Sequence, residues 1–247
     1  MATTGAGYFW QGVKLLRQPG IRAFVIVPVL INLLLFAALT AVLVAQFDTL
    51  LNWLVAQLGG WLEWLRWLLW LIAGIFWLVF YGYGFTLIST LIAAPFYGLL
   101  AERVELHLTG KAASEPLTLT GLLVLAHRTL VREVRKLLYF LPRFLGVVLL
   151  SLILSFVPGL GLLAPVLYFL WGAWSLALQH ADYAADNNGV TFAALRDRCA
   201  RRRGTSLSFG ALAMLSASVP LLNLLAVPAA VAGATALWVE RLDSGAG

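Results

Sequence analysis

Two stretches of thirty-five residues without a charged side chain, 144–178 and 205–239, place the strongest constraint on how this chain folds. Each stretch has a Val-Pro step near its middle, and proline removes a backbone donor and disfavours helix in the residue before it. The sequence therefore predicts turns at Pro158 and Pro220. The arms beside these turns hold fourteen to nineteen residues, fewer than the about 20 that a full span needs. We expect two helical hairpins that only partly penetrate a membrane.

The composition is that of an integral membrane protein. Hydrophobic residues make up 62% of the 247 residues and charged residues 11%, with a mean hydropathy of +0.91. A water-soluble domain does not present such a surface. Ten Trp and seven Tyr side chains fit a protein with two membrane interfaces. The net charge of +6 suits anionic headgroups or an anionic solute, and nucleic acid is not an expected partner.

Two further apolar runs predict transmembrane helices. Residues 23–47 carry no charge and are long enough for a first span. A third uncharged run begins at residue 67, and its proline, Pro95, lies near the end, which leaves 67–94 for a second helix of about 42 Å. The predicted fold class is thus an all-α integral membrane protein, with one membrane domain over 1–247.

Polar segments separate these apolar runs. Residues 102–143 hold seven basic and four acidic side chains and form an amphipathic cytoplasmic region, with a helix predicted over 120–139. Four cations of that helix fall within about 100 degrees of one another by the 3.6-residue period: Arg128, Arg132, Arg135 and Lys136. This stripe has two interpretations, a surface that faces lipid headgroups and a vestibule that attracts anions.

The second polar segment, 179–204, holds His180, Asp182 and Asp186, which could in principle bind a metal ion. Helix capping and turn formation explain its Asp and Asn residues more simply, so we expect no metal and no cofactor. The sequence lacks the spacings of common catalytic motifs, and we do not expect an enzyme. Its single cysteine, Cys199, excludes an intrachain disulfide.

Charge counts predict an orientation. The segment before the first span carries three positive charges and no negative one, so the positive-inside rule places the N-terminus in the cytoplasm. Residues 9–16 of that segment permit a short amphipathic helix on the membrane surface. If both hairpins turn back, the basic segments 102–143 and 179–204 share the cytoplasmic side. The similar sequences after Pro158 and Pro220 further suggest that the two hairpin tips meet at membrane depth.

Residues 18–22, QPGIR, place a helix-breaking Pro-Gly pair and an arginine at the start of the first span. Free backbone N–H groups and the positive end of a helix dipole form an anion site, to which Arg22 adds a full charge. An arginine at a cytoplasmic helix end is equally what topology requires. None of the long apolar runs contains Asp, Glu, Lys, Arg or His, whereas coupled pumps usually carry such groups at membrane depth. The sequence therefore favours a passive path, or no transport.

Several strings, in order from about residue 10 to residue 240, carry a family resemblance: LLRQPGIRAFVIVPVLINLLL, LIAAPFYGLLAERVE, YFLPRFLG, DYAADNNGVTF, FGALAML and VPLLNLLAVPAAVAGATALWV. Together they resemble the CysZ family of bacterial sulfate permeases. The resemblance implies sulfate uptake across the bacterial inner membrane for cysteine biosynthesis, by a homo-oligomer with two long transmembrane helices and two partly penetrating hairpins. It also implies that Gly20, Ile21 and Arg22 bind sulfate. Family members often carry a second basic residue next, where this chain has Ala23.

An alternative function is a non-transporting membrane scaffold or regulator, whose basic stripes hold anionic lipid headgroups. The two hypotheses differ in whether liposomes that contain the protein admit sulfate. They share the prediction of a multi-pass protein in a lipid bilayer.

Overall fold

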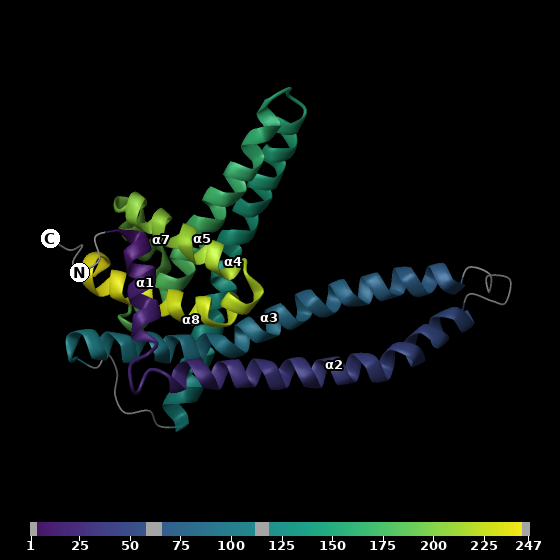
Figure 1. Ribbon diagram of the computed structural model, residues 1–247, viewed down its shortest axis with the longest axis horizontal. Helices are drawn as coiled ribbons and strands as arrows, with labels where there is room; N and C mark the ends of the chain where they lie inside the picture. Colours follow the sequence, from purple (N-terminus) through teal and green to yellow (C-terminus); the bar gives the residue numbers. More distant parts are fainter. Residues whose placement is uncertain (1–3, 58–65, 112–118, 244–247) are drawn as a thin grey trace. The chain divides into compact units, whose positions relative to one another are not determined.

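The structure, a computed structural model, describes residues 4–57, 66–111 and 119–243, and within these ranges it is built of helices without a β-strand. In chain order (Figure 1), its elements are α1 (Gly5–Leu15), α2 (Ala23–Gln57), α3 (Arg66–Thr109), α4 (Leu119–Ser155), η2 (Leu160–Leu163), α5 (Ala164–Asn187), α6 (Phe192–Arg201), α7 (Arg203–Ala217), α8 (Pro220–Leu237) and η3 (Trp238–Leu242). The all-α class predicted from the sequence is confirmed.

The chain groups into two compact units, which we describe separately. The larger unit holds residues 1–26 and 94–247, and the smaller unit holds residues 27–93. The first turn of α2 and the last part of α3 therefore belong to the larger unit, whereas the sequence analysis treats the whole chain as one domain.

Four helical segments in the described residues are long and apolar enough to cross a membrane: Ala23–Gln46, His127–Ser155, Leu160–Asn187 and Leu225–Leu242. This finding supports a multi-pass membrane protein, as the composition predicts. The segments differ in their surroundings. The apolar stretch of Leu225–Leu242 is 72% buried inside the protein, whereas that of His127–Ser155 is only 6% buried.

α3 continues to Thr109, beyond Pro95, where the sequence predicted the end of a span. Proline removes only one helical hydrogen bond, and the residues that follow it bury an apolar face. Leu100, Ala101 and Val104 are fully buried in the core of the larger unit. Tertiary packing thus keeps this stretch helical. α2 is likewise longer than predicted and ends at Gln57.

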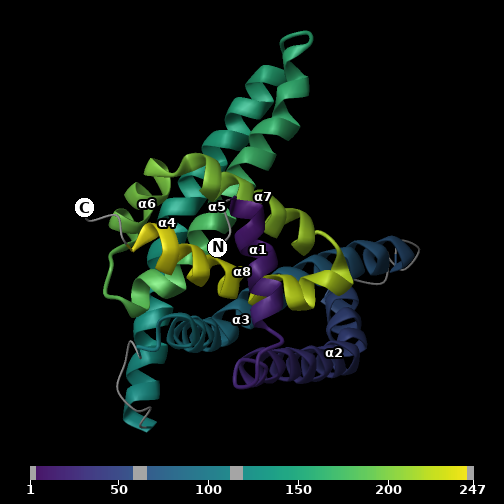
Figure 2. The ribbon, with the colours of Figure 1, turned by 60° about the vertical axis from the view of Figure 1, so that its left-hand side comes forward.

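α1 is a core helix, and the prediction of a surface-lying amphipathic helix over 9–16 is wrong. Tyr8 and Phe9 are almost completely buried, and α1 packs against α7 and α8 (Figure 2). Two glycines permit the close approach, because a Cβ on Gly12 would meet the Ala229 carbonyl and one on Gly233 would meet the Tyr8 carbonyl. Small residues of this kind let helix backbones approach closely in membrane proteins.

The first hairpin is formed by α4 and α5. Its turn lies at residues 156–163, and Gly159, directly after Pro158, adopts a positive φ of 81°, which glycine tolerates best. α4 runs unbroken from the basic stripe through Pro142 to Ser155, so the predicted amphipathic helix and first arm are one helix. Figures 1 and 2 show this hairpin projecting from the other helices of its unit. Its outer part exposes large apolar side chains, such as Phe156 and Leu162.

The second hairpin, α7 and α8, lies inside the larger unit, where it packs against α1 and α5. Its turn is short: Val219 is extended, and Pro220 opens α8. In both views its tip lies apart from the turn of the first hairpin, so the expected meeting of the two tips within one chain is wrong. The reason is composition, because Gly and Ala on α7 and α8 pack against protein while the arms of α4 and α5 present larger aliphatic side chains.

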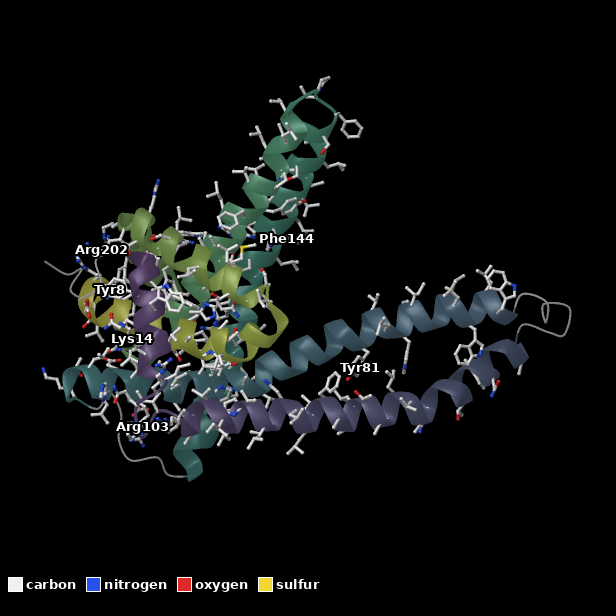
Figure 3. The ribbon with its side chains drawn as sticks, viewed as in Figure 1. Tyr8, Lys14, Tyr81, Arg103, Phe144 and Arg202 are labelled. Atoms are coloured by element: carbon white, nitrogen blue, oxygen red, sulfur yellow. The ribbon has the colours of Figure 1, made fainter. Side chains whose placement is uncertain are left out.

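In the smaller unit, the Tyr81 hydroxyl joins α3 to α2. The hydroxyls of Thr40 and Tyr81 lie 2.6 Å apart, and the Tyr81 hydroxyl also donates to the Phe36 carbonyl at 3.3 Å. Figure 3 shows Tyr81 pointing from α3 toward α2. Interhelical hydrogen bonds satisfy polar groups in otherwise apolar helix pairs, so this contact fixes the register of the pair.

Cys199 on α6 gives a simple test of the core of the larger unit. It is buried, and burial raises the pKa of its thiol to about 12. Because the thiolate is the reactive form, we expect no maleimide labelling of the native protein at pH 7 and complete labelling after denaturation, measured by intact mass. An Asp197→Cys variant, at a position on α6 whose side chain is 64% exposed, should add one label in the native state. Rapid native labelling of Cys199 would contradict this packing.

Candidate anion-binding site

The loop between α1 and α2 forms a compact turn. The N–H of Gln18 donates to the Leu15 carbonyl at 3.0 Å, and the N–H of Ile21 donates to the Gln18 carbonyl at 3.2 Å. Gly20 has a φ of 86°, a conformation that side chains with a Cβ rarely adopt. Ile21 is buried and anchors the turn in the core of the larger unit. The Pro-Gly pair therefore ends one helix and directs the chain into the next.

α2 starts with unoccupied donors. The Arg22 carbonyl accepts hydrogen bonds from the N–H groups of Val25 and Ile26, at 3.1 and 3.0 Å. Within the described ranges, the N–H groups of Arg22 and Ala23 have no acceptor, as is usual in the first turn of a helix. Such groups, with the positive end of the helix dipole, favour a bound anion.

Two guanidinium groups lie at this helix start. The Nε of Arg22 donates to the Arg17 carbonyl at 3.0 Å, which leaves the terminal nitrogens of Arg22 available. Both side chains are exposed, and no carboxylate in the described part of the chain pairs with either one. The sequence analysis did not single out Arg17. The signal was present, since a Pro-Gly turn reverses the chain and brings residues five apart together.

Arg17 and Arg22 line a cavity of about 480 Å³ in the larger unit. Ser216, near the end of α7, is the other polar residue among the described residues of its lining. The remaining lining is apolar and comes from α1, the start of α2, and α8: Phe9, Trp10, Val13, Leu16, Val25, Ile26, Leu225, Ala226 and Ala229. The site thus combines anion donors with an adjoining apolar volume.

The basic stripe of α4 is largely paired with α5. Arg132 donates to the Asp182 carboxylate through Nε and Nη2, at 2.9 and 2.6 Å, and to Asp186 through Nη1 at 2.7 Å. Lys136 is buried and lies 2.6 Å from the Glu133 carboxylate and 3.2 Å from that of Asp182. These two cations hold α4 against α5, and neither is free to attract an anion.

The other two cations of the stripe are more accessible. Arg128 lies 3.2 Å from the Asp186 carboxylate, and half of its side chain is exposed, while Arg135 is exposed. Both line a cavity of about 430 Å³ that also involves His127 and Thr191. The vestibule interpretation of the stripe therefore depends on Arg128 and Arg135.

The partners of the stripe add a role for Asp182 and Asp186 that the sequence did not predict. The turn expected at Asp186 is present, because the Asp186 carbonyl accepts from the Gly189 N–H at 3.0 Å. The carboxylates of both residues face cations of α4. His180 is separate from them, because its Nδ1 lies 2.7 Å from the Leu176 carbonyl. A sequence signal for this pairing was present. Asp182 and Asp186 are four residues apart on one helix, and so are Arg132 and Lys136 on another, so each pair lies on one helix face.

A family model described as Sulfate transporter CysZ/Etoposide-induced protein 2.4 matches residues 8–228. The chain belongs to this family. The match confirms the resemblance found in the sequence strings. It covers α1, the turn that contains Gly20, Ile21 and Arg22, the ion-paired helices α4 and α5, and both hairpin turns. The candidate site therefore lies in the part of the chain that the family shares.

Proposed function

We propose that this member of the CysZ family admits sulfate passively across the bacterial inner membrane, for assimilation and cysteine biosynthesis. Family membership supports sulfate as the transported ion. The four long uncharged runs support a passive, channel-like path, because they contain no Asp, Glu, Lys, Arg or His that could couple transport to protons. The observation that carries the proposal is the set of unpaired anion donors at the start of α2.

Sulfate binds, in this proposal, at Gly20, Ile21 and Arg22. No atom lies within 4 Å of where a Cβ of Gly20 would be, so the backbone is open to an ion. The N–H groups at the helix start and the terminal nitrogens of Arg22 supply directed donors. Arg17 adds a second positive charge, so that two guanidinium groups face a dianion. Arg128 and Arg135 form the proposed vestibule.

The first hairpin penetrates the bilayer only in part, in our proposal. Arg143 is the last charged residue of α4, and the twelve residues from Phe144 to Ser155 that follow it make about 18 Å of helix. The hydrocarbon core of a bilayer is about 30 Å thick. With the N-terminus in the cytoplasm, the basic segments then remain on the cytoplasmic side. We further propose that the path is completed in a homo-oligomer.

Replacing Arg22 with alanine tests the site. A hydrogen bond to a charged group contributes about 1.5–3 kcal/mol, so we expect Arg22→Ala to weaken sulfate binding roughly 10- to 100-fold, as measured by calorimetry. Arg103→Ala is the matched control, because the Arg103 guanidinium lies 5.5 Å from the centre of the Phe24 ring and outside the cavity lining. This control should bind sulfate within about twofold of the unmodified protein. Equal affinity in all three proteins would remove Arg22 from the site.

Liposomes test transport itself. Purified protein in liposomes should admit labelled sulfate down its gradient, without an added ion gradient or ATP, and Arg22→Ala should slow this uptake. Vesicles no more permeable than protein-free ones would support the lipid-binding scaffold instead. In that case, binding of anionic lipid, and not of sulfate, should depend on the basic side chains.

A further inference from the structure

The cavity beside the proposed sulfate site is larger and more apolar than sulfate requires. Sulfate is a dianion that prefers the arginines and the backbone donors, and apolar surroundings disfavour an unpaired charge. Nine of the twelve lining residues that the structure describes are apolar, and no carboxylate is among these twelve. Most of the volume would therefore remain empty when sulfate is bound.

The lining residues form a continuous apolar surface that begins at the two arginines. Leu16 precedes Arg17 in the chain, and Val25 and Ile26 follow Arg22 by one helical turn. Across from them, α8 contributes Leu225, Ala226 and Ala229. A cavity of about 480 Å³ falls within the range of small-molecule sites, which combine mostly apolar walls with a few placed polar groups.

We propose that the same site binds small alkyl oxyanions, of which alkanesulfonates are the type, with the alkyl chain in this cavity. The inference rests on the proposed sulfate site, because the sulfonate oxygens take the place of three sulfate oxygens at Arg22, Arg17 and the N–H groups of α2. The fourth position around sulfur, an oxygen in sulfate, carries the alkyl group. A single negative charge also suits a partly apolar site better than a double charge.

A homologous series gives the test. Methane-, butane- and hexanesulfonate are titrated directly into the purified protein, by calorimetry, next to sulfate. Burial of one methylene contributes enough to strengthen binding up to about fourfold, and about twofold where the cavity stays open to solvent. Hexanesulfonate should thus bind at least tenfold more tightly than methanesulfonate. 1-Hexanol, which has the chain without the anion, should bind no more tightly than methanesulfonate.

Two variants separate the cavity from partition into detergent. Val13→Trp fills the cavity from α1, and Leu225→Asn makes an exposed part of its lining polar. Either should reduce the dependence on chain length and leave sulfate binding within about twofold. Leu225→Asn decides the case if Val13→Trp does not fold.

The outcomes distinguish this inference from the proposed function. The inference is overturned if the affinity for sulfonates does not change with chain length. The sulfate site remains intact in that case, provided that sulfate binds and that Arg22→Ala weakens sulfate binding. The same dependence on chain length in both cavity variants, or tight binding of 1-hexanol, also overturns it, since the chain then partitions into detergent. Protein that binds neither sulfate nor any sulfonate contradicts both proposals.

Discussion

Asp182→Asn should lower the free energy of unfolding of the larger unit by about 3–5 kcal/mol. The Asp182 side chain is 2% exposed and contacts two cations from α4, Arg132 and Lys136. Removing its charge leaves Lys136, 3% exposed, with Glu133 as its one remaining carboxylate in the described contacts. Breaking a buried ion pair on one side is costly because each remaining cation has lost water and one of its carboxylate partners.

The matched control is the same substitution at an exposed ion pair. Asp197 lies 3.8 Å from Arg196 and its side chain is 64% exposed, so Asp197→Asn should cost less than about 1 kcal/mol. Thermal or denaturant unfolding in detergent measures both. Equal losses for Asp182→Asn and Asp197→Asn would show that the α4–α5 network is not a major source of stability.

Gly210→Ala should be strongly destabilising, by about 3 kcal/mol or more. Gly210 lies on α7 where it crosses α5, and an added Cβ would meet the carbonyl of Ala173 and lie 3.1 Å from the Cβ of Ala177. Backbone atoms cannot move aside as a flexible side chain can, so the two helices must separate. Overpacking of a core costs about 1–3 kcal/mol per site and more where the backbone is involved.

Gly204→Ala provides the control on the same helix. No atom lies within 4 Å of its added Cβ, and alanine has the higher helix propensity, so this variant should be neutral or slightly more stable. The measurement is the unfolding temperature and the yield of monodisperse protein. A Gly210→Ala protein as stable as Gly204→Ala would mean that α5 and α7 are less closely packed than the structure shows.

The same close packing positions the anion site. α1 approaches α8 through Gly12 and Gly233, and both helices line the cavity beside Arg17 and Arg22. A bulky residue at either glycine should therefore displace α1 together with the turn that carries Arg17 and Arg22, and so weaken sulfate binding without a change in the charge at the site. The stability of the larger unit and its proposed function depend on one set of helix contacts.

Much of this architecture follows from the sequence alone. Runs of uncharged residues require helices in a bilayer, since no water is present there to bond the backbone, and four helical segments of the described residues are long enough to span. The Pro-Gly pair before Arg22 determined that a helix starts there, because the pair fixes backbone geometry locally. The family resemblance rested on strings, and the match over residues 8–228 confirmed it.

The tertiary structure decided which apolar and charged residues face protein. Glycine and alanine are compatible with both lipid and close helix packing, so the burial of α1 and α8 depends on which helices meet. From the sequence alone, Lys136 and Arg132 are compatible with a solvated face. The structure places Asp182, from a helix far away in the sequence, opposite them. Arg17 lies beside Arg22 because of the path of the turn between them, which the structure shows. Local chemistry determined where helices begin and turn, and contacts between distant helices determined what each side chain does.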